Sequence, residues 1–412
     1  MNRTGSLVLT GAKIWEGRET GFVDRDLVIV DGEVMAGSVT GQTPETLDVS
    51  GSWIIPGLSD AHFHAYGLSM DGFENERGPL SYAALNGAKR LSGALARGFT
   101  TVRDVAGGDI GLSRAVDSGV IDAPRYLFTG PALSQTGGHG DPRSEHIDIC
   151  FGHGHMCEVV DGVDNLRLAV RSRLRTGAHA IKVMTSGGVF SLTDPVRIPQ
   201  YSAEELRAVS DEANRRGTYV TAHSYSVESV MHSIENGITC IEHGNLIDSA
   251  TAAQMHRRGV SLVPTLATYD AMSRRGPELG LNPVSLAKNE EVLSKGMEAA
   301  QMALAAGVRV GFGTDLMGDM EDEQLAGVRL QVEALGAETA LHSMTMGNAG
   351  IFGSSQLGHL GAGAWGDAVV LTGDPLEEPE ALWEMDARRM IVQGGCVVGS
   401  GAGESGSVGV PR

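Results

Sequence analysis

Two histidines separated by one residue, His62 and His64, are the best-placed candidates for metal chemistry in this chain. They follow the apolar run Trp53-Ile54-Ile55-Pro56-Gly57-Leu58. If the run is a strand, side chains two residues apart project to the same face. A strand end also holds ligands more rigidly than a loop does. The pair therefore predicts a metal site, but His-x-His arises by chance often enough that other residues must support it.

The elements that would position such ligands alternate along the chain. The unit before His223 shows the pattern: Ser202 and Glu205 form a capping box, a helical apolar face follows, and Gly217 ends the helix. Alternation of strands and helices implies parallel strands with helical crossovers. Eight such units predict a (β/α)₈ TIM barrel with insertions. The expected strands are 53–59, 99–104, 125–130, 180–185, 218–223, 237–242, 260–265 and 308–313.

The active site of such a barrel lies at the carboxyl ends of its strands. His62 and His64 follow the first expected strand, His223 and His243 end the fifth and sixth, and Asp315 follows the eighth. Each of these residues alone has an ordinary explanation as a cap or loop residue. Together they would need five coincidences of position, so we interpret them as one metal site.

Lys182 is the one cation among these strand-end candidates. It alternates with Ile181 and Val183, so it faces the barrel interior if those two face the helices. A bare buried ammonium is costly unless it is paired or neutralised. The residues alone leave open an ordinary pairing with a nearby carboxylate.

The two ends of the chain do not fit the barrel. Residues 6–50 and 367–398 read as short strands and turns, and neither segment has enough strands to bury a face alone. We therefore expect one small composite β-sandwich from residues 1–52 and 360–398, around a barrel at 53–359. The Gly- and Ser-rich tail, 399–412, is expected to be disordered.

Composition excludes several classes of function. The formal net charge of −19 disfavours nucleic acid or an anionic membrane as the main partner. The chain contains no secretory segment and no apolar run long enough to span a bilayer, so we expect a cytoplasmic protein. The four cysteines form no CxxC pair. The loop with Cys150, His153, His155 and Cys157 reads as an ordered loop with free thiols, and an accessory metal site there stays open.

The strand-end candidates His62, His64, Lys182, His223 and His243 resemble, together with Pro56-Gly57-Leu58 and Gly313-Thr314-Asp315, the two-metal subtype of the amidohydrolase superfamily. The resemblance covers nearly the whole chain. The resemblance implies two divalent metal ions, usually zinc. It assigns His62, His64 and Asp315 to the first ion, and it assigns His223 and His243 to the second. It implies that Lys182 is carbamylated and bridges them, which turns a buried cation into an anion.

Two close metal ions share a water and lower its pKa, so that it can attack a carbonyl carbon. Asp315 then serves as general base and afterwards as general acid, because an amine leaving group must be protonated to depart. A deaminase of the same superfamily fits less well. Such enzymes place a glutamate three residues after the fifth-strand histidine, where this chain has Ser226.

Two further segments, 133–141 and 184–202, resemble the branch of prolidase-like dipeptidases, Xaa-Lys/Arg carboxypeptidases and ochratoxin-degrading amidases. That branch cleaves an amide bond to an amino acid with a free carboxylate. His139 matches a histidine that polarises the substrate carbonyl. Tyr225 matches a tyrosine near the substrate.

Several questions stay open at this level. Phe190 and Arg197 have no secure assignment: Arg197 either clamps a carboxylate or is a solvated surface charge. Hydrolysis of a xenobiotic carbamate, urea or amide, or of a lactone, on the same metal centre is the alternative function. A non-catalytic scaffold is least favoured. Zinc, cobalt, manganese and iron all suit the ligands. The resemblance favours a homo-oligomer.

Overall fold

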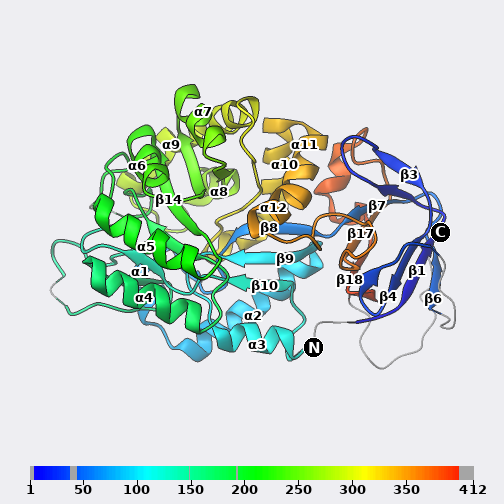
Figure 1. Ribbon diagram of the computed structural model, residues 1–412, viewed down its shortest axis with the longest axis horizontal. Coiled ribbons are helices and arrows are strands. Elements are labelled where there is room, and N and C mark those ends of the chain that lie inside the picture. Colours follow the sequence, from blue (N-terminus) through cyan, green and yellow to red (C-terminus); the bar gives the residue numbers. More distant parts are fainter. Residues whose placement is uncertain (1–3, 38–43, 148, 192–193, 399–412) are drawn as a thin grey trace.

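The computed structural model describes residues 4–37, 44–147, 149–191 and 194–398. The tail at 399–412, which we predicted to be disordered, lies outside these residues. Figure 1 shows the two regions of the architecture. In one, helices surround the strands; the other consists of strands from both ends of the chain. The predicted barrel with a small β-sandwich is confirmed.

The barrel strands run parallel in two hydrogen-bonded groups, β10-β9-β8 and β12-β11-β13-β14-β15-β16. Their carboxyl ends therefore meet at one face. Their bounds are β8 (Leu58–Phe63), β9 (Phe99–Asp104), β10 (Arg125–Phe128), β11 (Ala132–Ser134), β12 (Cys157–Val159), β13 (Ile181–Met184), β14 (Val220–Ser226), β15 (Cys240–Leu246) and β16 (Ser261–Val263).

The expected strand at 308–313 is not assigned as a strand; the segment continues the ring by a few backbone contacts. Leu262 forms a parallel bridge with Val310, and the Ala61 N–H donates to the Phe312 carbonyl at 2.8 Å. The segment thus lies between β16 and β8. Its glycines, Gly311 and Gly313, carry no side chain to pack, which weakens strand propensity.

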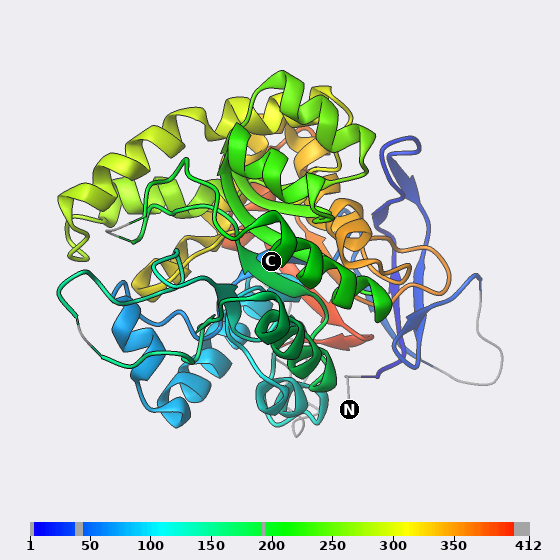
Figure 2. The same cartoon turned by 60° about the vertical axis from the view of Figure 1, so that its left-hand side comes forward.

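Helices cover the outside of the strands (Figure 2). The predicted alternation is interrupted where β10, β11 and β12 follow one another without a helix, and β11 and β12 were not among the expected strands. The capping box of Ser202 and Glu205 at the start of α5 is confirmed. The helix bounds are α1 (Gly72–Arg77), α2 (Leu80–Ala96), α3 (Ile110–Asp117), α4 (Val163–Arg175), α5 (Ala203–Arg215), α6 (Val227–Glu235), α7 (Ser249–Arg257), α8 (Leu266–Arg275), α9 (Pro283–Ala305), α10 (Gln324–Leu335), α11 (Ala337–His342) and α12 (Asn348–Phe352). In the described part of the chain, no helix combines the length and apolar character needed to cross a bilayer.

The sandwich consists of two sheets, β5-β4-β1-β6 and β19-β18-β17-β7-β2-β3. Alternate apolar side chains of both sheets, including Leu9, Ile29, Ile54 and Val370, form one buried cluster between them. The bounds are β1 (Leu7–Thr10), β2 (Lys13–Trp15), β3 (Phe22–Asp24), β4 (Leu27–Val30), β5 (Glu33–Val34), β6 (Glu45–Asp48), β7 (Trp53–Pro56), β17 (Ala368–Leu371), β18 (Arg388–Gln393) and β19 (Cys396–Val397).

The segment expected as a single strand, 53–59, is divided at Gly57. Strand β7 pairs with β17 and β2 in the sandwich, whereas β8 begins the barrel. A Cβ atom at Gly57 would overlap the Thr100 side chain, so only glycine allows the chain to pass so closely there. Strand pairing thus gives Trp53–Pro56 to the sandwich, beyond the division that we expected at residue 52.

A buried ion pair joins the two regions. The Arg125 guanidinium of β10 donates to both carboxylate oxygens of Asp367, at 2.9 and 3.1 Å, and stacks on Trp365 at 3.9 Å from the ring centroid. Asp367 also accepts from the Gly394 N–H. One side chain therefore ties a barrel strand to two turns of the sandwich.

We expect Asp367→Ala to destabilise the protein by about 3–5 kcal/mol, because Arg125 would stay buried without its counter-ion. Denaturant unfolding followed by tryptophan fluorescence measures the change. Glu333→Ala, which removes an exposed ion pair with Arg329, is the matched control and should shift stability by less than about 1 kcal/mol. Equal effects of the two substitutions would contradict the anchoring role.

Candidate active site

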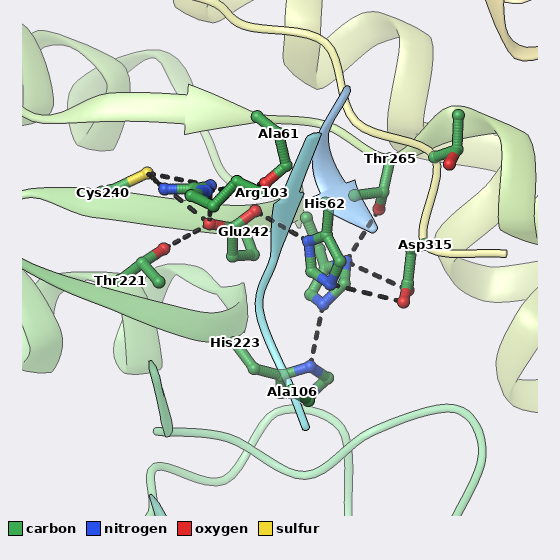
Figure 3. Close-up of polar contacts among 12 residues, drawn as sticks. Ala61, His62, Arg103, Ala106, Thr221, His223, Cys240, Glu242, Thr265 and Asp315 are labelled. Atoms are coloured by element: carbon green, nitrogen blue, oxygen red, sulfur yellow. Dashed lines mark hydrogen bonds and ion pairs between the residues drawn. The ribbon is translucent and has the colours of Figure 1, made fainter. Parts of the chain in front are cut away.

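Three of the predicted ligands, His62, His223 and Asp315, lie close together at the carboxyl ends of the barrel strands (Figure 3). His62 and Asp315 come within 3.3 Å of each other, and His64 Nε2 lies 2.8 Å from Asp315 Oδ1. His223 Nδ1 and His243 Nε2 are 2.9 Å apart. Within the described residues, ligand atoms of His62, His243 and Asp315 all lie within 4.8 Å of one another and form a possible metal-ligand cluster. The four predicted histidine ligands and Asp315 thus come together.

Strand geometry explains this convergence. His62 lies on β8, His223 on β14 and His243 on β15. Strands β14 and β15 pair in parallel with Ser224 opposite His243, which brings the two histidine ends side by side. Asp315 follows the 308–313 segment, and its backbone N–H donates to the His62 carbonyl at 2.8 Å.

Two of the predicted ligands have left-handed backbone conformations. His243 has φ +74° and Asp315 has φ +57°. For a residue other than glycine such a conformation costs on the order of 1 kcal/mol or more, and it occurs most often where function requires it. The backbone turns at these two residues, and their side chains point inward to the cluster.

Glu242 is a further functional residue that sequence reasoning missed. Its fully buried carboxylate accepts from Arg103 at 2.5 Å and lies 2.7 Å from His62 Nδ1. Thr221 also hydrogen-bonds it. Burial would raise the pKa of Glu242, but Arg103 and His62 hold it well below its usual range. A charged carboxylate on Nδ1 leaves His62 Nε2 free for a metal ion and fixes the ring orientation.

Asp60 is the second residue that sequence reasoning missed. Its carboxylate accepts from the Thr314 N–H and hydroxyl, from Gln324 and from the His62 N–H. It thereby ties the end of β8 to the segment that carries Asp315. An acidic residue two positions before a ligand histidine on a buried strand was the available signal, because its side chain points to the same face.

Lys182 lies beside the cluster, fully buried, and its Nζ has no hydrogen-bond partner among the described residues. Burial lowers the pKa of Lys182, and the charges of Glu242 and Asp315 oppose this only in part. A lysine with a lowered pKa keeps a larger neutral fraction, and a neutral amine is the form that reacts with carbon dioxide. The ordinary pairing with a carboxylate, which the sequence left open, is absent within the described residues.

These residues fit the metal ions that the resemblance implies. His64 Nδ1 is also buried and without a partner, so two nitrogen atoms in the cluster lack a protein hydrogen bond. Burial lowers the pKa of His223 and of His243, which favours the neutral imidazole that a metal ion requires. Nitrogen and oxygen donors of this kind suit zinc and neighbouring divalent metals.

His139 lies against the cluster. Its ring stacks on His223 with centroids 4.1 Å apart, and Nδ1 lies 3.2 Å from the Ser191 hydroxyl and 3.5 Å from Asp194. A Cβ atom at position 188 would overlap the His139 ring, which explains the glycine there. The free edge of the imidazole therefore faces the same cavity as the metal ligands.

Tyr225 stacks on His243 with centroids 4.9 Å apart, and its hydroxyl lies 2.9 Å from that of Tyr269 on α8. Both tyrosines line the cavity, whose volume is about 500 Å³. Its walls are mixed: apolar side chains such as Met70, Phe190 and Met272 lie opposite polar ones. A cavity of this size and character suits a small organic substrate.

The structure also shows where Phe190 and Arg197, the two residues without an assignment, lie. Phe190 lines the cavity. Arg197 is a surface residue, with 56% of its side chain exposed and an ion pair to Glu291 at 2.6 Å. The deaminase position, Ser226, caps α6 and donates to the Arg197 carbonyl.

The cysteine- and histidine-containing loop does not form a second metal-ligand group within the described residues. Cys150 is exposed, whereas Cys157 is buried, and both are free thiols. His155 Nε2 lies 2.7 Å from the Gly78 carbonyl oxygen, which ties the loop to the end of α1. The interpretation as an ordered loop with free thiols fits these contacts.

We expect Glu242→Gln to weaken zinc binding about 10–100-fold, because His62 would lose the charged partner that orients it. Equilibrium competition with a fluorescent chelator measures the affinity. Glu298→Gln, at an exposed site, is the control. A folded Glu242→Gln protein with unchanged zinc affinity would contradict the role of this carboxylate.

Comparison with known proteins agrees with this geometry. The amidohydrolase family model matches residues 53–400. Ochratoxinase of Aspergillus niger is 32% identical over 366 residues, which cover 83% of this chain and 75% of that protein. The crystal structure of a prolidase complexed with N-methylphosphonate-L-proline has a TM-score of 0.92 at 39% identity and covers 95% of this chain and 99% of the other. The structure of A. niger ochratoxinase has a TM-score of 0.82 at 26% identity, over 96% of each chain. The chain belongs to the amidohydrolase family.

Proposed function

We propose that this amidohydrolase-family hydrolase cleaves an amide bond to an amino acid with a free carboxylate, as in dipeptides, N-acyl amino acids or ochratoxin-type amides. The observation that carries the proposal is the position of His139 and Tyr225, which line one cavity with the cluster of His62, His243 and Asp315. Similarity to a prolidase and to ochratoxinase supports it, since the names of both proteins refer to substrates with such an amide bond.

In this proposal the site holds two divalent metal ions, with zinc as the expected metal. His62, His64 and Asp315 would hold one ion, His223 and His243 would hold the other, and carbamylated Lys182 would be the ligand shared by both. The ions, when bound, supply an activated water and polarise the substrate carbonyl.

The protein side chains would carry the remaining steps. Asp315 accepts the proton of the attacking water and returns it to the departing amine. His139 donates a hydrogen bond to the carbonyl oxygen as negative charge develops there. Tyr225 donates to the substrate carboxylate. The apolar wall with Phe190 and Met272 accommodates the substrate side chains and keeps water out.

Assembly and location extend the proposal. We propose a cytoplasmic homo-oligomer that acts on small molecules and has no nucleic-acid or membrane partner. The net charge of −19 supports the exclusion of nucleic acid, because phosphate and the protein surface carry the same sign. Sedimentation of the purified protein tests the assembly.

A panel of dipeptides and N-acyl amino acids, each beside its C-terminal carboxamide, tests the function with zinc-loaded protein. We expect the free acids to be cleaved at least about tenfold more efficiently than the amides, because one charge-assisted hydrogen bond is lost in each amide. Equal cleavage of both sets would contradict recognition of the carboxylate. The better candidate would then be a carbamate, urea or lactone hydrolase on the same centre.

Replacement of Lys182 tests the bridging ligand separately. We expect Lys182→Ala to lower metal content by at least about tenfold at limiting zinc, with recovery when a short carboxylate such as propionate is added. Metal analysis after gel filtration measures this. Lys295→Ala removes an exposed lysine and should leave the metal content unchanged. A Lys182→Ala protein that binds two ions without propionate would contradict carbamylation.

A further inference from the structure

A chain of hydrogen bonds leads from a metal-ligand histidine to the substrate cavity through Tyr269. Tyr269 is buried on α8, with 1% of its surface exposed. Its hydroxyl lies 2.8 Å from His243 Nδ1 and 2.9 Å from the Tyr225 hydroxyl. Tyr269 therefore joins a residue of the metal site to a residue proposed to hold the substrate.

The direction of these hydrogen bonds follows from the chemistry of the groups. His243 Nε2 lies 2.9 Å from His223. Nδ1, on the other edge of the ring, lies 2.8 Å from both Tyr269 and Thr265 and 3.9 Å from Asp315 Oδ2, which is beyond hydrogen-bond distance. An imidazole that gives its Nε2 lone pair to a metal ion carries its hydrogen on Nδ1. Nδ1 is then a donor, and the hydroxyl oxygens of Tyr269 and Thr265 are its acceptors.

Tyr269 accepts a hydrogen bond whichever hydroxyl the imidazole selects. If Nδ1 donates to Thr265, the Thr265 hydroxyl can donate in turn to Tyr269, 3.4 Å away. In both cases the Tyr269 oxygen is an acceptor, and its own hydrogen is left for Tyr225.

Tyr225 thus receives a hydrogen bond from Tyr269 on its oxygen. A phenolic hydroxyl has one hydrogen, and within the described residues the Tyr225 hydroxyl has no hydrogen-bond partner other than Tyr269. Tyr225 lines the cavity, and the cavity is the remaining direction for that hydrogen. A tyrosine hydroxyl keeps its hydrogen at neutral pH.

We propose that Tyr269 is a positioning residue that directs the hydroxyl hydrogen of Tyr225 into the cavity, so that Tyr225 meets the substrate as a donor. The inference rests on the proposed function, because it requires a substrate carboxylate as the acceptor. It also links the two halves of the site: with a metal ion on Nε2, His243 would carry its hydrogen on Nδ1, and this hydrogen would set the direction of the hydrogen bonds through Tyr269.

A double-mutant cycle of Tyr225→Phe and Tyr269→Phe tests the proposal. The probe is a reduced-amide Ala-Pro, in which a methylene replaces the scissile carbonyl, with either a free carboxylate or a carboxamide. Calorimetry on the zinc-loaded proteins gives the dissociation constants without turnover. Metal content and unfolding temperature are measured for each variant, and kcat and KM are measured for the best free-acid substrate.

We expect Tyr269→Phe to weaken binding of the free acid about three- to tenfold, to change binding of the carboxamide much less, and to leave metal content unchanged. KM should rise more than kcat falls. The decisive result is that the double variant binds the acid no more weakly than Tyr225→Phe, because Tyr269 acts only through Tyr225. Tyr201→Phe is the matched control: it removes a buried hydroxyl bonded to the Val160 carbonyl, and it should leave metal content and the binding of both probes unchanged.

Independent, multiplicative losses in the double variant would overturn the proposal, as would an equal loss for acid and carboxamide or a loss of metal in Tyr269→Phe. These failures leave the proposed function intact if the unsubstituted enzyme still prefers the free acid. If the unsubstituted enzyme binds neither probe, the proposed function fails and this inference fails with it.

Discussion

The salt bridge between Arg103 and Glu242 is the interaction on which the geometry of the site depends. Both side chains are fully buried, and removing either would leave a charge in the barrel interior without a partner. Arg103 also donates to the Ala61 carbonyl of β8, and Glu242 faces His62. The pair therefore joins β9, β15 and β8, and it places a negative charge behind the imidazole where a metal ion needs a polarised ligand. Burial of a charge, which is costly elsewhere in a barrel, here holds the ring in one orientation.

Much of this architecture could be predicted because it follows from local periodicity. Strands have a two-residue repeat, and parallel strands end at one face, so histidines at strand ends had to meet. The start of β8 was harder to predict, because β7 and the first residue of β8 form one apolar run, and the pairing of β7 with β17 separates them. The segment at 308–313 has the composition of a strand but forms few ladder hydrogen bonds. Neither difference is visible in a stretch of sequence read alone.

The residues that support the ligands could not be predicted for a related reason. Glu242 and Tyr269 act on histidines of other elements, and their importance depends on the packing of segments that are distant in sequence. Arg197 shows the converse. Its guanidinium suits a carboxylate chemically, yet the fold pairs it with Glu291 at the surface. Residue type indicates what a side chain can do, whereas the three-dimensional neighbourhood decides whether it does so.

The passage of β7 into β8 at Gly57 has a consequence for how the protein is made. Strand β7 lies between β2 and β17, so on a ribosome it emerges early and keeps one edge open until β17 is synthesised near the end of the chain. At about 5–20 residues per second, that interval lasts on the order of tens of seconds. An unpaired apolar edge invites pairing with other chains. The strand that carries His62 is therefore attached to an unfinished sheet through most of translation.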